Sequence, residues 1–274
     1  REEVLRATGP TSGGHARAKI GAKKDGTLVA AELEMEYEAG AFAGSPVKLG
    51  CMTGFAPYNL KHVSCIGWDV VVNRPQAAAY RAPGAPVAAF AVESAMDELA
   101  DTLGIDPLEL RIKNAAVEGT QAPYGVKFPK IGCLETLREA QATEHYNMPL
   151  GPNQGRGVAS GFWFNIGGQS SASVMVNPDG TVIVATGSPD IGGSRASMAL
   201  MAAEVLGIDY ENIKPLVADT ESVPFSDLTG GSRVTFATGN AVVEAAEDAV
   251  NDMKRRAAKV WDVDIDQVEW KDGI

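Results

Sequence analysis

A run of Pro, Gly and Ala residues, Pro75–Pro86, leads directly into a helical pattern. Little besides Tyr80 and Arg81 projects from this run, so its backbone can approach a ligand closely. Pro86 suits a first helical turn, and an apolar stripe at helical spacing follows it: Phe90, Val92, Ala95, Met96, Leu99 and Leu103. The pattern predicts a loop-to-helix site for an anion or a cofactor, with an ordinary proline-rich turn on a core helix as the alternative.

The composition excludes some classes of protein. With 274 residues, 45% of them hydrophobic, the chain can form one large domain or two modest ones with a real core. The net charge of -11 argues against nucleic acid as a partner, because such a partner requires clustered Lys and Arg. No stretch approaches the roughly eighteen apolar residues of a membrane helix, so no membrane span is expected.

The three cysteines, Cys51, Cys65 and Cys133, lie far apart without paired ligand spacing, and the histidines have no partners at ligand spacing. This predicts reduced thiols in a reducing compartment and no direct metal ligand. The chain opens on Arg1 without a Met and stops just after the strand-like Val268–Trp270, so we expect both ends to be cut from something longer. The expected compartment is the cytoplasm, with the periplasm open because an N-terminal segment would be missing.

Local patterns predict two hairpins and five helices. Each hairpin connection places a Gly between β-rich runs. The expected strands are Ala16–Ala22, Leu28–Tyr37, Ser173–Val176 and Thr181–Thr186. The expected helices cover about 86–103, 134–143, 195–206 and 235–261, and a further helix opens at Asp106 with Pro107 in its first position.

This order predicts an α+β fold with two successive lobes of mixed or antiparallel sheet and packed helices. We place the domains at residues 1–135 and 136–274, with the boundary somewhere between 115 and 157. The order of hairpin and then helix occurs twice, which is either a distant internal duplication or a coincidence. The acidic residues of the first long helix, Glu93, Asp97, Glu98 and Asp101, are expected to form a solvated face.

Two further glycine-rich segments, Gly187–Ser194 and Thr229–Arg233, also open onto helices. Paired glycines expose backbone N–H groups at a helix N-terminus, where the macrodipole favours anions. Ser194 and Ser232 can cap the helix or donate a hydroxyl, and Arg233 offers a cationic arm suited to phosphate. Each segment alone is more often a structural cap, but with the Arg81 loop they form three candidate anion cradles.

Three consecutive aromatic residues, Phe162, Trp163 and Phe164, precede a Gly-Gly pair. In a strand, Phe162 and Phe164 face one way and Trp163 the other, which favours a place in a sheet core. The alternative is that Phe162, or secondly Trp163, lines a pocket for a flat substrate.

The run Tyr80–Gly84, followed by Phe90–Ala100 and Leu103–Asn114, resembles the molybdopterin-binding subunit of the xanthine dehydrogenase and aldehyde oxidase family. The similarity resumes in the glycine-rich segments after residue 155 and covers nearly the whole chain. It implies a molybdenum–molybdopterin cofactor, in the cytosine dinucleotide form that bacterial members typically use. It assigns the cofactor contacts to Arg81, Ala82, Gly192, Gly193, Ser194, Gly230, Gly231 and Ser232, and the substrate pocket to Tyr80, Phe162 and Trp163.

The chain departs from the family at three positions. Gly193 stands where a glutamine is usual, so either the alignment shifts by one residue or the usual cofactor contacts differ. Ala82 replaces the cysteine that binds copper in carbon monoxide dehydrogenases, so that reaction is not expected. Pro83 stands where purine oxidases place a phenylalanine, so xanthine is not a favoured substrate.

The family's general base, a glutamate near the C-terminus of the subunit, is expected beyond Ile274, and one glycine-rich cofactor loop before Arg1. We therefore expect no catalytic residue within this chain and no activity from it alone. It lacks a cysteine cluster and a dinucleotide fingerprint, so iron–sulfur and FAD groups are expected on partner subunits. Its other partners would be the remainder of the molybdenum subunit and a small-molecule substrate.

Three functions compete. The first is the cofactor-binding portion of an oxidoreductase that hydroxylates an aldehyde or an aromatic N-heterocycle with oxygen derived from water. The second is a non-catalytic scaffold or cofactor-delivery relative with the same fold, which the Gly193 replacement favours. The third, an unrelated phosphate- or nucleotide-binding domain, requires the match over residues 80–114 to be accidental.

Overall fold

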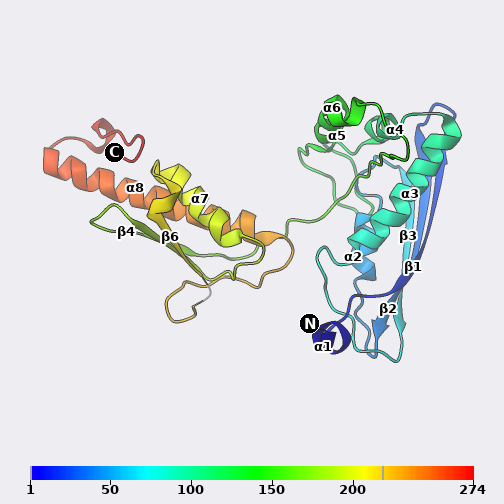
Figure 1. The fold of residues 1–274 in the computed structure, drawn as a ribbon, viewed down its shortest axis with the longest axis horizontal. Coiled ribbons are helices and arrows are strands. Elements are labelled where there is room, and N and C mark those ends of the chain that lie inside the picture. Colours follow the sequence, from blue (N-terminus) through cyan, green and yellow to red (C-terminus); the bar gives the residue numbers. More distant parts are fainter. Residues whose placement is uncertain (1, 218) are drawn as a thin grey trace. The chain divides into compact units, whose positions relative to one another are not determined.

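The computed structural model describes residues 2–217 and 219–274, which pack as two compact units, residues 1–163 and 164–274 (Figure 1). In the first unit α5 (Cys133–Ala142) and α6 (Glu144–Asn147) follow α4, and α5 packs against it. The first compact unit extends to residue 163, and the domain bounds 1–135 and 136–274 stay a prediction. Among the described residues, no helix is both long enough and apolar enough to cross a bilayer.

The first unit is built on a three-stranded sheet in the order β1 (Gly14–Ala22), β2 (Leu28–Gly40) and β3 (His62–Val71). β1 and β2 form the expected antiparallel hairpin, whereas β2 and β3 run parallel. Side chains of β2 alternate between a buried face and an exposed face, as the period of two in a strand requires. The strand β3 was not expected, and its parallel pairing brings the ends of β2 and β3 to the same edge.

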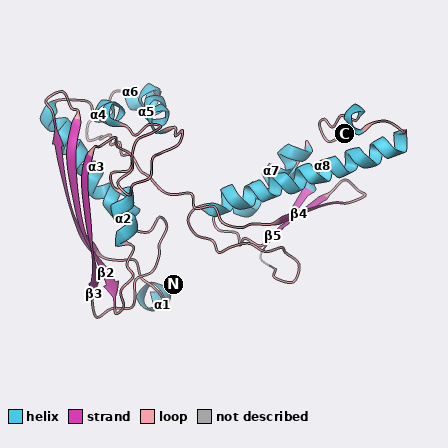
Figure 2. Cartoon of the chain, turned by 180° about the vertical axis from the view of Figure 1, so that it is seen from behind, coloured by secondary structure: helices cyan, strands magenta, loops and turns pink. Residues whose placement is uncertain are grey.

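One face of this sheet is covered by α2 (Val47–Thr53) and α3 (Ala85–Leu103) (Figure 2). The apolar stripe of α3 packs on the buried side chains of β2. Val92 and Met96 of α3 are fully buried there, together with Leu33 and Met35 of the strand. The short α1 (Glu2–Ala7) precedes the sheet.

The helix ends follow the predicted signals. α3 ends at Gly104, whose φ of 63° is left-handed. α4 (Pro107–Asn114) begins after Asp106, whose carboxylate accepts hydrogen bonds from the backbone N–H groups of Leu108 and Glu109 at 2.9 and 3.0 Å. The cap predicted from the sequence is confirmed.

The second unit contains the sheet β4 (Ala172–Val176), β5 (Val182–Thr186) and β6 (Ile213–Val217). Its helices are α7 (Ser194–Leu206) and α8 (Gly239–Trp261), which pack on the sheet around Val184, Met198 and Val242. Short elements complete it: the 3-10 turns η1 (Tyr210–Asn212) and η3 (Ile265–Gln267), and the π-helical turn η2 (Val234–Thr238). Residues 268–270 form no strand, so the strand-like interpretation of that segment is wrong.

Both units share one topology: an antiparallel hairpin, a helix, a strand parallel to the second hairpin strand, and a longer helix. A glycine closes the central strand in each. A Cβ on Gly40 would lie 2.2 Å from the carbonyl oxygen of Pro75, and one on Gly187 would lie 2.4 Å from that of Pro224. The repeated order seen in the sequence is thus a repeated architecture, as an internal duplication would produce.

Candidate functional site

A cavity of about 350 Å³ lies within the first unit, beside the N-terminus of α3. Three segments enclose it: the end of α2 with the turn after it, the first turns of α3 with the preceding loop, and residues 160–163. It is lined by Thr53, Gly54, Pro57, Ala82, Ala85, Pro86, Ala89, Ser160, Gly161, Phe162 and Trp163. The structure therefore brings together Ala82, Phe162 and Trp163, three of the site residues predicted from the sequence.

The loop before α3 owes its course to two left-handed residues, Ala82 with φ 53° and Gly84 with φ 81°. A Cβ on Gly84 would lie 2.3 Å from the carbonyl oxygen of Pro46, so only glycine fits there. The Gly84 carbonyl accepts a 2.9 Å hydrogen bond from the Tyr37 hydroxyl. The sequence signal of this loop, a Pro-Gly-Ala run, thus encodes a backbone held close to the sheet.

Tyr80 and Arg81 do not line the cavity. Both residues are exposed, and 70% of Tyr80 is open to solvent. Of the loop residues expected at the site, Ala82 is placed in the cavity wall. The other two lie on the surface just before it.

Phe162 both packs in an aromatic cluster and lines the cavity. Its ring centroid lies 5.5 Å from that of Phe128 and 6.3 Å from that of Tyr124. Residues 154–169 form neither helix nor strand, so the expected strand with alternating faces is wrong here. The half-buried Phe162 and Trp163 lie in this irregular segment.

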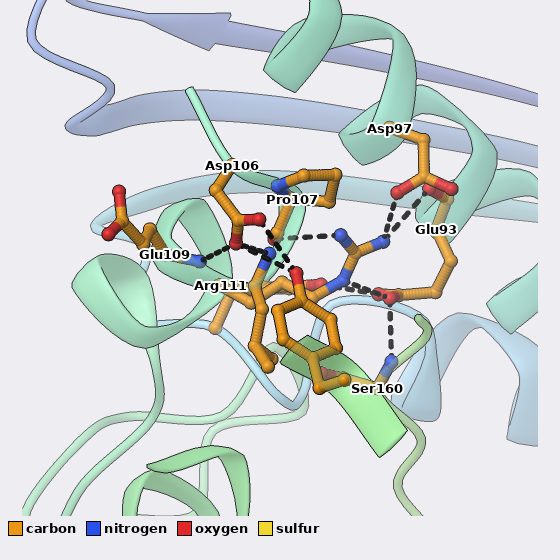
Figure 3. A network of polar contacts seen from close by, with 10 residues as sticks. Glu93, Asp97, Asp106, Pro107, Glu109, Arg111 and Ser160 are labelled. Atoms are coloured by element: carbon orange, nitrogen blue, oxygen red, sulfur yellow. Dashed lines mark hydrogen bonds and ion pairs between the residues drawn. The ribbon is translucent and has the colours of Figure 1, made fainter. Parts of the chain in front are cut away.

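A buried ion pair that was not predicted from the sequence lies behind this wall. The guanidinium of Arg111, which is fully buried, donates from Nε to Glu93 Oε2 at 2.8 Å and from Nη2 to Asp97 Oδ1 at 2.8 Å (Figure 3). Glu93 is only 5% exposed, so its assignment to a solvated helix face is wrong. Local periodicity could not reveal this, because the partner lies on the next helix.

Two further groups donate to Glu93. The Tyr58 hydroxyl donates to Oε1, and the backbone N–H of Ser160 donates to Oε2 at 2.6 Å. Burial, reinforced by the charge of Glu93, raises the pKa of Tyr58 well above its ordinary value, so the hydroxyl keeps its proton. The bond from Ser160 connects the ion pair to the cavity wall.

In the second unit the turn before α7 is open but already holds a carboxylate. Gly192 and Gly193 are left-handed, and no atom lies within 4 Å of where their Cβ atoms would be. The Asp190 carboxylate accepts hydrogen bonds from the Arg195 backbone N–H at 3.1 Å and the Ser194 hydroxyl at 3.2 Å. These bonds, the one from Arg195 first, lower the pKa of Asp190. An anion in this turn would therefore meet a negative charge of the chain itself.

The segment before α8 holds Gly230, Gly231 and Ser232, the last two with φ of 64° and 57°. The Gly231 carbonyl accepts a 3.0 Å hydrogen bond from the N–H of Ile166, and a Cβ on Gly231 would lie 2.5 Å from Ile166 Cδ1. Ser232 is exposed, whereas Gly230 and Gly231 are half-buried. A bound group can therefore reach this turn at Ser232.

Arg233 is not the cationic arm that the sequence suggested. The residue is 3% exposed, and all five of its N–H donors are used within the unit. It donates to three backbone carbonyls and two hydroxyls, those of Gly167, Gln169, Asp227, Ser170 and Ser226. Arg233 therefore fastens the neighbouring loops rather than presenting its charge to a ligand.

Hydroxyl groups join the first glycine-rich segment of this unit to η2 and to residues 170 and 226. Ser188 Oγ lies 2.8 Å from Ser226 Oγ and 3.0 Å from Thr238 Oγ1, and Thr238 Oγ1 lies 2.9 Å from Ser170 Oγ. Across residues 2–217 and 219–274 no three His, Cys, Asp or Glu side chains converge as metal ligands would. The site residues thus offer backbone amides, hydroxyls and open glycine turns, which suit an anionic organic group.

Family models for the molybdopterin cofactor-binding domain match residues 1–115 and 132–274. The chain is 35% identical over 260 residues to an aldehyde oxidoreductase of Megalodesulfovibrio gigas, covering 88% of this chain and 28% of the relative. It is 30% identical over 268 residues to the xanthine dehydrogenase molybdenum-binding subunit of Escherichia coli O157:H7, covering 90% of this chain and 35% of the relative.

A solved structure of the aldehyde oxidoreductase from Desulfovibrio gigas superposes with a TM-score of 0.70 at 31% identity. That superposition covers 88% of this chain and 28% of the solved one. The chain thus spans about a third or less of the length of these relatives.

Proposed function

Because this chain belongs to the family of molybdopterin cofactor-binding domains, we propose that it forms the cofactor-holding part of a longer molybdenum hydroxylase. The observation that carries the proposal is the cavity beside α3, where a left-handed Ala82 and two aromatic residues meet. A large anionic cofactor needs close backbone approach, and the loop Pro75–Gly84 provides it. The chemistry that the bound group would supply is oxidation of a substrate carbon with oxygen from water.

The residues present fit such a group in two places. In the first unit, Arg81 and Ala82 would contact it, the arginine through its exposed cation. In the second unit, the turns Gly192–Ser194 and Gly230–Ser232 would supply backbone N–H groups, and Ser232 a hydroxyl. Of these glycines, Gly192 and Gly193 have no atom within 4 Å of the Cβ position, which leaves the space that a closely approaching ligand requires.

We propose an aldehyde or an aromatic N-heterocycle as the substrate. Phe162 and Trp163 form an aromatic part of the cavity wall, which suits a flat, apolar molecule. Ala82 offers no thiolate for copper, and Pro83 offers no aromatic ring to stack on a purine. The remaining wall is built from small residues such as Ala85 and Ala89, so the cavity binds by shape more than by charge.

The rest of the enzyme would lie outside this chain. We propose a cytosine dinucleotide form of the cofactor, iron–sulfur and FAD groups on partner subunits, and a general-base glutamate in the remainder of the molybdenum subunit. The name of the Escherichia coli relative, a molybdenum-binding subunit, supports a division among subunits. Electrons from the substrate would leave through those partners.

A second candidate is a scaffold or cofactor-delivery relative that keeps the fold without the chemistry. Two observations favour it: Gly193 supplies no side-chain donor, and the Asp190 carboxylate already accepts from the Arg195 N–H and the Ser194 hydroxyl beside it. A bound anion would have to displace or tolerate that carboxylate.

Metal and nucleotide analysis of the native complex tests the proposal. We expect roughly one molybdenum and one cytidine monophosphate, released by hydrolysis, per chain. We also expect oxidation of benzaldehyde or quinoline with an artificial electron acceptor. Metal and nucleotide without turnover would favour the delivery relative, and neither in a well-folded complex would overturn the cofactor site itself.

A further inference from the structure

We propose that Glu93 is a positioning residue for the substrate cavity, holding the wall segment Ser160–Trp163 at a fixed distance from the first turns of α3. The inference rests on the proposed function only in taking this cavity as the substrate site. The arrangement of buried groups behind the wall is independent of that assignment.

The carboxylate of Glu93 is fixed from three sides. Arg111 Nε donates to Oε2 at 2.8 Å and Ser160 N–H donates to Oε2 at 2.6 Å (Figure 3). The Tyr58 hydroxyl donates to Oε1. These donors come from α4, from the turn after α2 and from the cavity wall. A carboxylate with donors from three segments has little freedom to move. Through it, α3 is joined to each of these three segments.

Arg111 is itself held in place by several hydrogen bonds. Its Nη1 donates to the Pro107 carbonyl at 2.9 Å, and its Nη2 donates to Asp97 at 2.8 Å and to the Glu93 carbonyl at 3.3 Å. A buried carboxylate is costly unless it is paired, and this cation provides the pairing. The pair therefore lets a charged acceptor exist behind the wall, where it binds the Ser160 N–H more strongly than a neutral acceptor would.

One wall of the cavity lies on α3, and the opposite wall is hydrogen-bonded to the same helix. Ala89 lines the cavity and lies four residues before Glu93, so the two side chains are neighbours on one face of α3. The opposite wall, Ser160–Trp163, is attached to that helix through the bond from Ser160 to Glu93. Residues 154–169 form neither helix nor strand, so this bond is a direct link between the aromatic wall and α3, beside the packing of Phe162 on Phe128 and Tyr124.

Glu93 acts through Ser160 and not on the substrate. Its carboxylate is not part of the cavity lining, the residue is 5% exposed, and its oxygens already accept three hydrogen bonds. Removing the charged acceptor would therefore alter how the substrate fits, while the reacting groups stay in place. The expected signature is a change in KM with kcat retained.

The test uses the full-length holoenzyme with Glu93→Gln and, as a matched control, Asp97→Asn. Asp97 contacts the same Arg111 from the half-exposed side and does not touch the wall. With benzaldehyde as the probe substrate, Glu93→Gln should raise KM about tenfold with kcat within about twofold, the effect of losing one charge-assisted hydrogen bond. Asp97→Asn should leave both values within about twofold.

Hydrogen–deuterium exchange supplies a readout that does not depend on turnover. Peptides covering residues 156–164 should exchange about tenfold faster in Glu93→Gln and unchanged in Asp97→Asn, at unchanged molybdenum content. If wild-type enzyme fails to oxidise benzaldehyde, the proposed aldehyde substrate fails, and the exchange result still decides the role of Glu93.

A second variant, Ser160→Pro, removes the same N–H from the wall side and leaves the ion pair with Arg111 intact. If Glu93→Gln does not fold, Ser160→Pro tests the positioning role of Glu93 in its place. A similar rise in KM and faster exchange in residues 161–164 would support the positioning role. Unchanged KM and unchanged exchange in a folded, molybdenum-loaded variant would overturn it, as would equal effects from Asp97→Asn.

Discussion

The Tyr37 hydroxyl donates a 2.9 Å hydrogen bond to the Gly84 carbonyl, joining the central strand of the first sheet to the loop that precedes α3. Tyr37 is 2% exposed, and burial raises its pKa, so the hydroxyl remains a donor at neutral and alkaline pH. Tyr37→Phe should therefore lower the free energy of unfolding by about 1 kcal/mol, measured by urea denaturation of the full-length protein. The exposed Tyr210→Phe serves as the control, and an equal effect there would contradict this role.

Gly84 should tolerate no side chain. Gly84→Ala would force a left-handed alanine and place its Cβ 2.3 Å from the Pro46 carbonyl oxygen. We expect a loss of about 3 kcal/mol in the free energy of unfolding, from backbone strain and overpacking together. Gly104→Ala is the matched control, since Gly104 is also left-handed but has no atom within 4 Å of its Cβ position. It should cost only about 1 kcal/mol, and equal losses would refute the packing argument.

Replacing Arg233 should destabilise the second unit even with a conservative residue. Lysine has three donors, and the guanidinium site has five acceptors arranged around a planar group. Arg233→Lys should lower the free energy of unfolding by about 3 kcal/mol, as measured by thermal denaturation of the full-length protein. Arg195→Met, on an exposed pair 3.9 Å from Asp190, should cost less than about 0.5 kcal/mol. An unchanged free energy of unfolding in Arg233→Lys would show that the loops do not depend on the planar guanidinium group.

Asp25 in the first hairpin turn should make stability depend on pH in the acidic range. The backbone N–H of Thr27, at 3.0 Å, and the Lys113 ammonium, at 3.1 Å, lower its pKa to about 2. A carboxyl group with a lowered folded pKa stabilises the fold above its ordinary pKa of 3.8, and loses that effect as the pH falls towards 2.

The variant Asp25→Asn should accordingly unfold at lower urea concentration than wild type at pH 6. The difference should shrink as the pH falls from about 4 to about 2. Asp266→Asn, for which the same measurement is made, controls for a general charge effect in this acidic protein. A difference between Asp25→Asn and wild type that is constant over this range would contradict the assignment.

The parts of the fold with strong local signals were predicted well. Both hairpins, α3 and α4 follow from strand alternation, helical spacing and the Asp106 cap, all of which act within a few residues. β3 and β6 were missed, since β3 mixes Gly and Asp among its apolar residues and β6 contains Pro215, which an edge strand tolerates. The strand expected around Phe162 was wrong. Aromatic residues favour strands, but these pack from a segment that is neither helix nor strand.

The roles of the candidate site residues stay predictions, but the structure brings three of them together. Ala82, Phe162 and Trp163 do line one cavity, because the glycine and aromatic signals lie in the segments that build it. The roles of Glu93 and Arg233 were not predictable from local pattern. Glu93 meets its partner 18 residues away, and Arg233 donates to carbonyls more than 60 residues away. A helical wheel shows which face carries charge, but not which charge a second helix will cover.

The glycines that close the central strands, Gly40 and Gly187, limit how the loops beyond them can vary. At both positions a proline carbonyl occupies the space that a side chain would need. A change in loop length has to be absorbed away from these two contacts, because a shift of either strand end would drive its backbone against the proline carbonyl. Redesign of substrate preference in this scaffold should therefore alter loop tips and leave both strand ends untouched, at equivalent points of the two units.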